Sequence, residues 1–328
     1  MRRRHFISFG VSAAAWPLAA RAQQSDPVRR IGVLNGVVEG DPEGEERVRA
    51  FQRGLEELGW TIGRNIWIDY RWGISDVEKT QAAILELLAL TPDVILANTS
   101  RAVAILHQAT QTVPVVFTTI YEPVAQGFVQ SLAHPGGNIT GFTGVEVTIG
   151  AKWLGLLKTI APSVTRVAFM FDPNNPGPMQ TSHSAEAAAP NFPVKMVMAP
   201  VHGPAEIEAA MTMLGREPGG GLIVPPDGFL MPYRKLMIEL AAKYRLPAIY
   251  GYPIFAVEGG LAAYGNKASE QFRQAAGYVD RILRGEKAGD LPVQEPAKYE
   301  LVINLKTAKA LGLDIPQSTL LLADEVLE

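Results

Sequence analysis

The sequence predicts an α/β protein made of two doubly wound parallel-sheet lobes. Short apolar runs that fit buried strands alternate with segments of helical period, which is the pattern of parallel sheets covered by helices. The alternation stops at a glycine-rich stretch, residues 131–144, and then starts again. The chain of 328 residues also exceeds the size of a typical single domain, so two lobes are expected.

The first half of the chain contains the elements of the first predicted lobe. Residues 31–34 form an apolar run that fits a short buried strand. Val48, Phe51 and Leu55 then recur at helical spacing, and Gly59 marks the end of that helix. The elements that follow are a strand at 66–68, a helix around Ile84 and Leu87, a strand at 93–96, a helix at 102–110 and a strand at 114–117.

The second half repeats this alternation. A helix with Trp153, Leu156 and Ile160 on one face ends before Pro162. Apolar runs then predict strands at 167–171, 194–197, 222–224, 248–250 and 261–264. The chain closes with a helix at 272–282, a strand at 301–304, a helix at 307–311 and a short C-terminal helix.

Residues 1–22 have the composition of an export signal. A basic start precedes a mostly apolar stretch, and residues 20–22 fit the small-x-small cleavage pattern. The arginine pair at 3–4, followed by Phe6 and Ile7, favours the twin-arginine pathway over the alternative of an ordinary Sec signal. Either pathway predicts export to a bacterial periplasm.

The composition narrows the class of protein further. There is no cysteine, so neither a disulfide nor a lipid-modified N-terminal cysteine is expected. The formal net charge falls from −3 to −7 when the four arginines of the signal are removed, and a mildly acidic chain argues against a nucleic-acid partner. No later segment is long and apolar enough to span a membrane. We expect a periplasmic monomer.

Common catalytic motifs are absent from the chain. It lacks the glycine patterns of dinucleotide and phosphate loops, the nucleophile elbow of hydrolases and the zinc-protease motif. The four histidines beyond the signal lie at positions 107, 134, 183 and 202, without metal-ligand spacing. We therefore expect a binding protein without a metal or cofactor, rather than an enzyme.

Polar residues gather in the loops after the predicted strands of the first lobe. Ligands of doubly wound sheets lie beyond the carboxyl ends of the strands, so these loops are expected to line a cleft between the lobes. The candidate ligand-binding residues here are Asn35, Thr99, Ser100, Thr119, Tyr121 and Glu122. Hydroxyls at a helix N-terminus suit a carboxylate, although simple N-capping by Ser100 is an equal alternative. Glu122 could meet a ligand cation or merely face solvent.

The second predicted lobe offers turns and aromatic residues at the matching positions. The candidate ligand-binding residues here are Asn174, Asp227, Tyr252 and Tyr264. Tyrosines beside a few polar groups can enclose a small organic ligand. The turns around Asn174 and Asp227 need no ligand to explain them, however, and the tyrosines could equally pack at the edge of the core.

Long stretches of the chain match one family pattern. The clearest is EPVAQGFVQSLAHPGGNITG at 122–141, and others lie at 152–158, 259–265, 278–286 and 300–312. Together with the signal, they resemble periplasmic substrate-binding proteins of ABC transporters, in the family that includes tryptophan- and tyrosine-type binding proteins. The resemblance implies a type I periplasmic binding fold with a three-crossover hinge, one small-molecule ligand in the cleft and docking onto an ABC permease in the inner membrane.

The chain departs from the family pattern at two places. Glu122 stands where typical members have aspartate, and Asn266-Lys267 stands where they have Pro-Asp. If these positions touch the ligand, its charge pattern differs from that in relatives. We expect a small carboxylate or amino acid with an aromatic or apolar body. A sensing domain that docks on a signalling receptor is the alternative function, and an enzyme is a more remote one.

The glycine-rich stretch is expected at the junction of the lobes. We expect the first lobe at 23–143 plus about 266–292, and the second at 144–265 plus about 293–328. The stretch leads from a turn into a strand, so it does not form a phosphate loop, and its Asn138-Ile-Thr140 sequon is a chance match in a bacterial chain. The expected hinge residues in the first crossover are Gly141, Phe142, Thr143 and Gly144.

Overall fold

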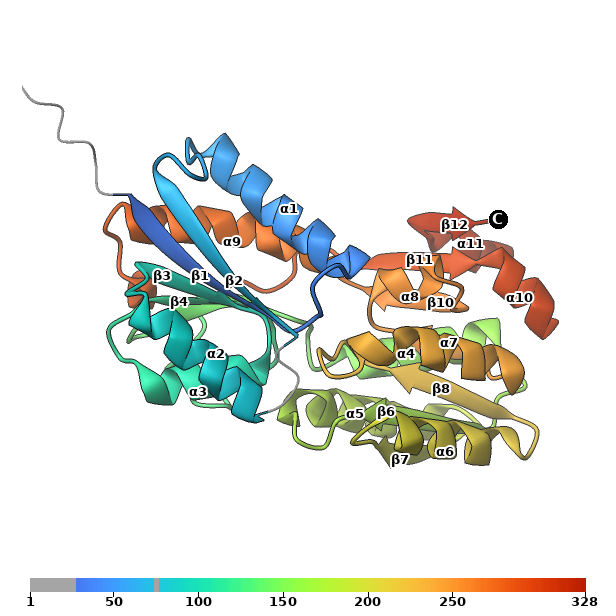
Figure 1. Cartoon of the computed structure of the whole chain (residues 1–328). Coiled ribbons are helices and arrows are strands. Elements are labelled where there is room, and N and C mark those ends of the chain that lie inside the picture. The colour runs from blue at the N-terminus through green and yellow to red at the C-terminus, as the bar shows by residue number, and fades with distance from the viewer. Residues whose placement is uncertain (1–27, 74–76) are drawn as a thin grey trace, which may run out of the picture.

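The computed structural model describes residues 28–73 and 77–328. The predicted export signal lies outside these residues. Over the described residues the chain folds into two α/β lobes, each built around its own sheet (Figure 1). No helix in this part of the chain is both long and apolar enough to cross a membrane.

The first lobe is a five-stranded parallel sheet with helices on both faces. Its strands are β1 (Arg29–Asn35), β2 (Ile66–Trp72), β3 (Val94–Ala97), β4 (Val115–Ile120) and β5 (Ile139–Thr143), in the spatial order β2-β1-β3-β4-β5. Its helices are α1 (Pro42–Glu57), α2 (Val77–Ala89), α3 (Ser100–Ala109) and α9 (Ala268–Leu283), followed by the short 3-10 helix η3 (Ala288–Asp290). Phe51 of α1 and Phe272 of α9 are fully buried together over one face. Leu87 of α2 and Leu106 of α3 belong to the core of the other face.

The second lobe is built around a seven-stranded sheet. Its strands are β6 (Arg166–Phe171), β7 (Lys195–Pro200), β8 (Gly220–Val224), β9 (Ala248–Tyr250), β10 (Ala262–Gly265), β11 (Glu300–Asn304) and β12 (Glu325–Leu327), in the spatial order β12-β11-β10-β9-β8-β6-β7. Its helices are α4 (Ile149–Ile160), α5 (Pro176–Ala188), η1 (Ala189–Asn191), α6 (Pro204–Gly215), η2 (Met231–Tyr233), α7 (Arg234–Lys243), α8 (Pro253–Val257), α10 (Leu305–Leu311) and α11 (Gln317–Leu322). Trp153 of α4 and Phe169 of β6 are fully buried in its core.

The predicted fold class is confirmed, with one difference in the second sheet. β11 pairs with β10 in the antiparallel direction, so that Tyr264 lies opposite Leu301. The cause is the route of the chain, which leaves β10, forms α9 in the first lobe and returns along residues 291–299. It therefore enters the second sheet again from the side of the first lobe and runs opposite to β10.

Within the described ranges the chain passes between the lobes three times, at 144–148, 266–267 and 291–299. Figure 1 shows α9, coloured orange, beside the blue helix α1 of the first lobe. Gln271 of α9 ties this region together, because its Oε1 accepts a hydrogen bond from the Thr119 amide (2.9 Å) and its Nε2 donates to the Thr143 carbonyl (2.6 Å). The ends of β4 and β5 are thus held against the start of α9.

The predicted hinge residues form the end of β5 and the first residue after it. Gly141 has a φ of +152°, and a Cβ there would lie 2.1 Å from the Phe117 carbonyl oxygen. Only glycine fits this close approach of β4 and β5. Phe142 and Thr143 are buried in the first lobe, and the chain leaves the sheet at Gly144. A bending motion of this segment stays a prediction.

Candidate binding site between the lobes

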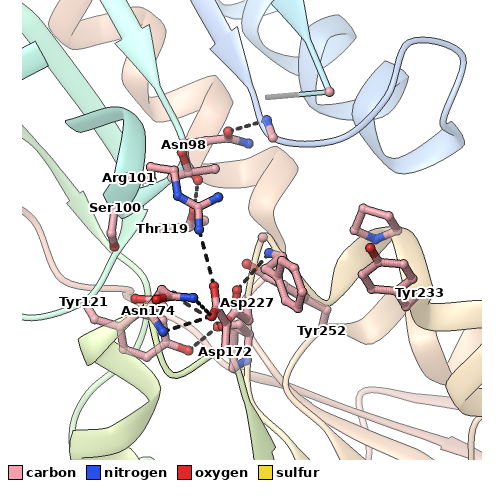
Figure 2. Close-up of a pocket in the computed structure, with 18 of the residues that line it drawn as sticks. Asn98, Ser100, Arg101, Thr119, Tyr121, Asp172, Asn174, Asp227, Tyr233 and Tyr252 are labelled. Carbon is pink, nitrogen blue, oxygen red and sulfur yellow. Dashed lines mark hydrogen bonds and ion pairs between the residues drawn. The ribbon is translucent and has the colours of Figure 1, made fainter. Parts of the chain in front are cut away.

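A cavity of about 230 Å³ lies between the two lobes (Figure 2). Its walls come from loops after β1, β2, β3 and β4 of the first lobe and after β6, β8 and β9 of the second. These loops all follow the carboxyl ends of parallel strands, which is where α/β sheets bind ligands. A molecule in the cavity would therefore touch both lobes.

The N-terminus of α3 forms part of the first-lobe wall. Thr99 is the N-cap of this helix, and its Oγ1 accepts a hydrogen bond from the Ala102 amide (3.2 Å). Ser100 begins the helix and lines the cavity. The alternative that Ser100 caps the helix is therefore wrong, because Thr99 does so. The positive end of the helix dipole favours an anionic ligand group at this place.

An asparagine pair fixes the loop beside this helix. Asn98 Oδ1 accepts a hydrogen bond from the Gly36 amide (2.9 Å), and Asn98 Nδ2 donates to Asn35 Oδ1 (3.3 Å). Asn98 and Gly36 line the cavity, whereas Asn35 is fully buried and does not. Asn35 therefore shapes the wall from behind.

Thr119 and Tyr121 line the cavity where the lobes join. Thr119 has a φ of +59°, and its hydroxyl donates to backbone carbonyls, among them that of Asn98 (3.2 Å). The Tyr121 hydroxyl donates to the Pro226 carbonyl of the second lobe (2.5 Å). Burial raises the pKa of Tyr121 well above its usual value, so its phenol stays protonated and acts as a donor.

Two buried carboxyl groups form the second-lobe side of the cavity. Asp172 Oδ1 accepts hydrogen bonds from the backbone and side-chain amides of Asn174 (2.9 and 3.0 Å). Asp227 accepts from the Phe229 amide (2.8 Å) and from Asn175 Nδ2 (3.4 Å). Burial, with a smaller contribution from the nearby Asp172 carboxylate, raises the pKa of Asp227 to about 7. A cationic group placed here would be strongly favoured.

Arg101 of α3 reaches across the cavity to this carboxyl pair. One of its terminal nitrogens lies 3.6 Å from Asp172 Oδ2, as the dashed line in Figure 2 shows. Arg101 is about a quarter exposed, whereas Asp172 is almost fully buried. The cavity thus presents a guanidinium group and a helix N-terminus on one side and carboxyl groups on the other. This charge pattern suits a ligand that carries both signs.

Aromatic side chains give the cavity its apolar surface. Phe229 and Tyr233 pack edge to face, with ring centroids 5.6 Å apart. Tyr252 is buried, and this burial raises its pKa to about 12, so its hydroxyl also remains protonated. Such walls suit a flat or apolar body on the ligand.

Most of the predicted ligand residues come together in this cavity. Those that line it are Thr99, Ser100, Thr119, Tyr121, Asn174, Asp227 and Tyr252. Glu122 does not line it; it adopts a left-handed turn conformation with a φ of +38° just beyond Tyr121. Tyr264 does not line it either, because its ring packs against Tyr299 at a centroid distance of 5.7 Å.

The sequence did not single out Arg101, Phe229 and Tyr233, which line the cavity, and it indicated Asp172 only as part of the turn around Asn174. The predicted strand ends gave their approximate positions, since three of them lie within five residues of the end of β3, β6 or β8. The direction of Arg101 was not predictable, because a charged residue in the first turn of a helix usually faces solvent. Among the described residues, no group of three or more His, Cys, Asp or Glu side chains could hold a metal.

The sequence is similar to those of known substrate-binding proteins. The family model described as ABC transporter substrate binding protein matches residues 30–327. A tyrosine-binding protein from Clostridioides difficile is 26% identical over 272 residues, which cover 83% of this chain and 78% of that protein.

Two solved structures have a fold similar to that of this chain. An ABC domain in complex with L-Trp from Streptococcus pneumoniae superposes with a TM-score of 0.83 at 24% identity, covering 91% of this chain and 99% of that chain. A ligand-free, open structure of a substrate-binding protein with adhesive properties from Clostridium difficile gives a TM-score of 0.66 at 25% identity, covering 92% and 99%. Both likenesses support the two-lobed α/β fold of this chain.

Proposed function

Because the chain belongs to the family of ABC transporter substrate-binding proteins, we propose that it binds one amino acid with an aromatic or apolar side chain between its lobes. The observation that carries this proposal is the charge pattern of the cavity. The start of α3 faces the buried Asp172 and Asp227 across a cavity of about 230 Å³, and Arg101 reaches over it to Asp172. An α-amino acid carries the complementary charges on one carbon atom.

The ligand carboxylate would lie at the start of α3. There it would accept hydrogen bonds from Ser100 and be attracted by Arg101 and by the helix dipole. The ammonium group would lie against Asp227, with Asp172 nearby, and its positive charge would offset the cost of keeping the Asp227 carboxylate buried. The side chain would pack against Phe229 and Tyr233. The tyrosine and tryptophan ligands named for two similar proteins support this assignment.

We further propose that the protein acts in the periplasm as a monomer, after export by the signal at 1–22, and delivers its ligand to an ABC permease without chemical turnover. The boundaries of the lobes would lie at 143/144, at about 265/266 and at about 292/293. The positions of the sheets and of α9 support this division, and the charged cavity supports capture rather than catalysis.

A ligand screen tests the proposal. The mature chain is unfolded, dialysed and refolded to remove any bound ligand, and then screened by thermal shift against amino acids, aromatic acids, sugars and polyamines. A ligand at 100 times its Kd stabilises a protein by about 2.7 kcal/mol, which is easily detected. We expect aromatic or apolar amino acids to raise the melting temperature and to bind in a 1:1 ratio by calorimetry. Stabilisation by sugars or polyamines alone, or steady conversion of a bound compound, would contradict the proposal.

A further inference from the structure

A second contact between the lobes lies outside the cavity lining and involves three charged side chains. The Arg234 guanidinium donates to Asp41 Oδ2 at 2.6 Å and, through Nε, to both Glu258 oxygens at 3.0 and 2.9 Å. The side chains of Arg234, Asp41 and Glu258 are 5%, 9% and 20% exposed. We refer to these three residues as the interlobe ion-pair cluster.

The cluster joins one residue of the first lobe to two of the second. Asp41 is the N-cap of α1, whereas Arg234 begins α7 and Glu258 follows the end of α8. The Arg234–Glu258 pair lies within the second lobe, so it can persist whatever the position of the first lobe. The Asp41–Arg234 pair is different, because separation of the lobes must break it.

Apolar contacts accompany this ion pair. Val37, in the loop after β1, is 2% exposed and belongs to a core cluster formed mainly by the second lobe. Trp72, at the end of β2, packs against the same cluster. One buried and one partly buried residue of the first lobe thus pack on the second lobe close to Asp41. The structure therefore holds an interface between the lobes that lies outside the cavity lining.

We propose that the interlobe ion-pair cluster is a latch that positions the two lobes in the closed arrangement and so raises ligand affinity without touching the ligand. The inference rests on the proposed function, since it assumes a ligand that binds between the lobes. The observed affinity of such a protein is its intrinsic affinity multiplied by the fraction of molecules in the competent arrangement. A contact made only in the closed arrangement increases that fraction.

Asp41 and Glu258 have opposite effects on closure of the lobes. Asp41 pairs with Arg234 only in the closed arrangement, so its charge favours closure. Glu258 pairs with Arg234 in both arrangements and neutralises the cation when the lobes are apart. Without the charge of Glu258, Arg234 has no carboxylate partner when the lobes are apart. The ion pair with Asp41 then favours the closed arrangement more strongly. A purely structural role would give both substitutions the same sign.

The chain allows a clean test because it contains no cysteine. Leu85 on α2 and Met213 on α6 are exposed residues of the two lobes, so replacing both with cysteine gives sites for spin labels that report lobe separation. In the parent protein Asp41 Oδ1 caps α1 by accepting hydrogen bonds from the Glu43 and Gly44 amides. In Asp41→Asn the remaining side-chain oxygen keeps this capping role. The Asn amide group then faces the guanidinium as donor against donor, and the latch is lost.

We expect Asp41→Asn to shift the label distances of the ligand-free protein to longer values. In the same variant the Kd of the amino acid found by the screen should rise about tenfold, a change of ~1.4 kcal/mol. Glu258→Gln should shorten the distances and lower the Kd. Glu270→Gln, which removes an exposed ion pair with Arg273 within the first lobe, is the control and should change neither quantity.

The latch is refuted if Asp41→Asn leaves the ligand-free distances unchanged, or if Glu258→Gln weakens binding as much as Asp41→Asn does. The distance measurement needs no ligand. A failure of the ligand screen would therefore count against the proposed function, whereas unchanged distances would count against the latch alone.

Discussion

Replacing Asp227 with asparagine removes a carboxyl group that is 3% exposed and lies beside Asp172 in the cavity. The two side chains have the same shape. The Asn oxygen can still accept the hydrogen bond from the Phe229 amide, whereas its amide group replaces the oxygen that accepts from Asn175 Nδ2, so the long contact of 3.4 Å to Asn175 is lost. The substitution therefore changes the charge of the site with little effect on its packing.

The expected change in stability follows from the pKa of Asp227, which burial raises from 3.8 to about 7. Because the folded pKa lies above the unfolded one, the folded chain holds a proton between pH 4 and pH 7 that the unfolded chain has lost. The stability of the ligand-free protein therefore falls as the pH rises through this window, and the loss is complete above pH 7. A shift of about three pH units corresponds to a loss of about 4 kcal/mol, of which about 3 kcal/mol falls between pH 5 and pH 7.

Urea denaturation of the ligand-free protein at pH 5, 6, 7 and 8 measures this effect. We expect the stability of Asp227→Asn relative to the parent to increase by about 3 kcal/mol from pH 5 to pH 7 and then to stay level. In Asp172→Asn the midpoint of the change should move to lower pH, because the like charge beside Asp227 is gone. A difference between Asp227→Asn and the parent that is independent of pH would refute the reasoning.

Ligand binding should respond to pH in the opposite direction. An ammonium group needs the ionised form of Asp227, so the affinity of the parent should increase about tenfold per pH unit below pH 7 and reach a plateau above it. Asp227→Asn should bind more weakly and lose this dependence. Calorimetry at the same four pH values checks both statements.

Other substitutions separate binding from folding. Ser100→Ala should weaken binding with little change in stability, whereas Thr99→Ala should cost about 1 kcal/mol of stability through loss of the helix cap. Calorimetry measures the affinity and urea denaturation the stability. If the two variants changed affinity and stability equally, the assignment of Ser100 to the ligand and Thr99 to the cap would be contradicted. Gly141→Ala should destabilise the first lobe by more than about 3 kcal/mol, since its Cβ would lie 2.1 Å from the Phe117 carbonyl oxygen; a melting temperature within about 2 °C of the parent would contradict this. Tyr121→Phe should cost about 1 kcal/mol by leaving a second-lobe carbonyl without its donor, and an unchanged urea midpoint would speak against that bond.

Much of the fold was predictable because buried parallel strands read as apolar runs. The run at 167–171 corresponds to β6 at Arg166–Phe171, and α4 ends at Ile160, just before Pro162. Short exposed elements gave no such signal: β12 is an edge strand of three residues, with Glu325 and Val326 exposed. The direction of β11 depends on the passage of the chain through the first lobe, which no local pattern encodes.

The sequence predicted which loops form the site, but it did not predict which side chains of those loops point into the cavity. Strand ends identified the region of Thr99, Ser100 and Asp227, because the carboxyl edge of a parallel sheet gathers its loops. The direction of each side chain depends on packing that the sequence does not show. Tyr264 packs on a neighbouring tyrosine within its own lobe, whereas Arg101 crosses the cleft to Asp172.

The central claim is that one cavity binds both charged groups of an amino acid. The most direct test compares three ligands that share the same side chain. Calorimetry at pH 7.5 would measure the Kd of the best amino acid from the screen, of its deaminated acid and of its decarboxylated amine. We expect the amino acid to bind 1:1 and each analogue to bind at least about 100-fold more weakly, since each leaves buried groups of the site unpaired. Equal affinity for the deaminated acid would contradict the assignment of Asp227 as the partner of the ammonium group.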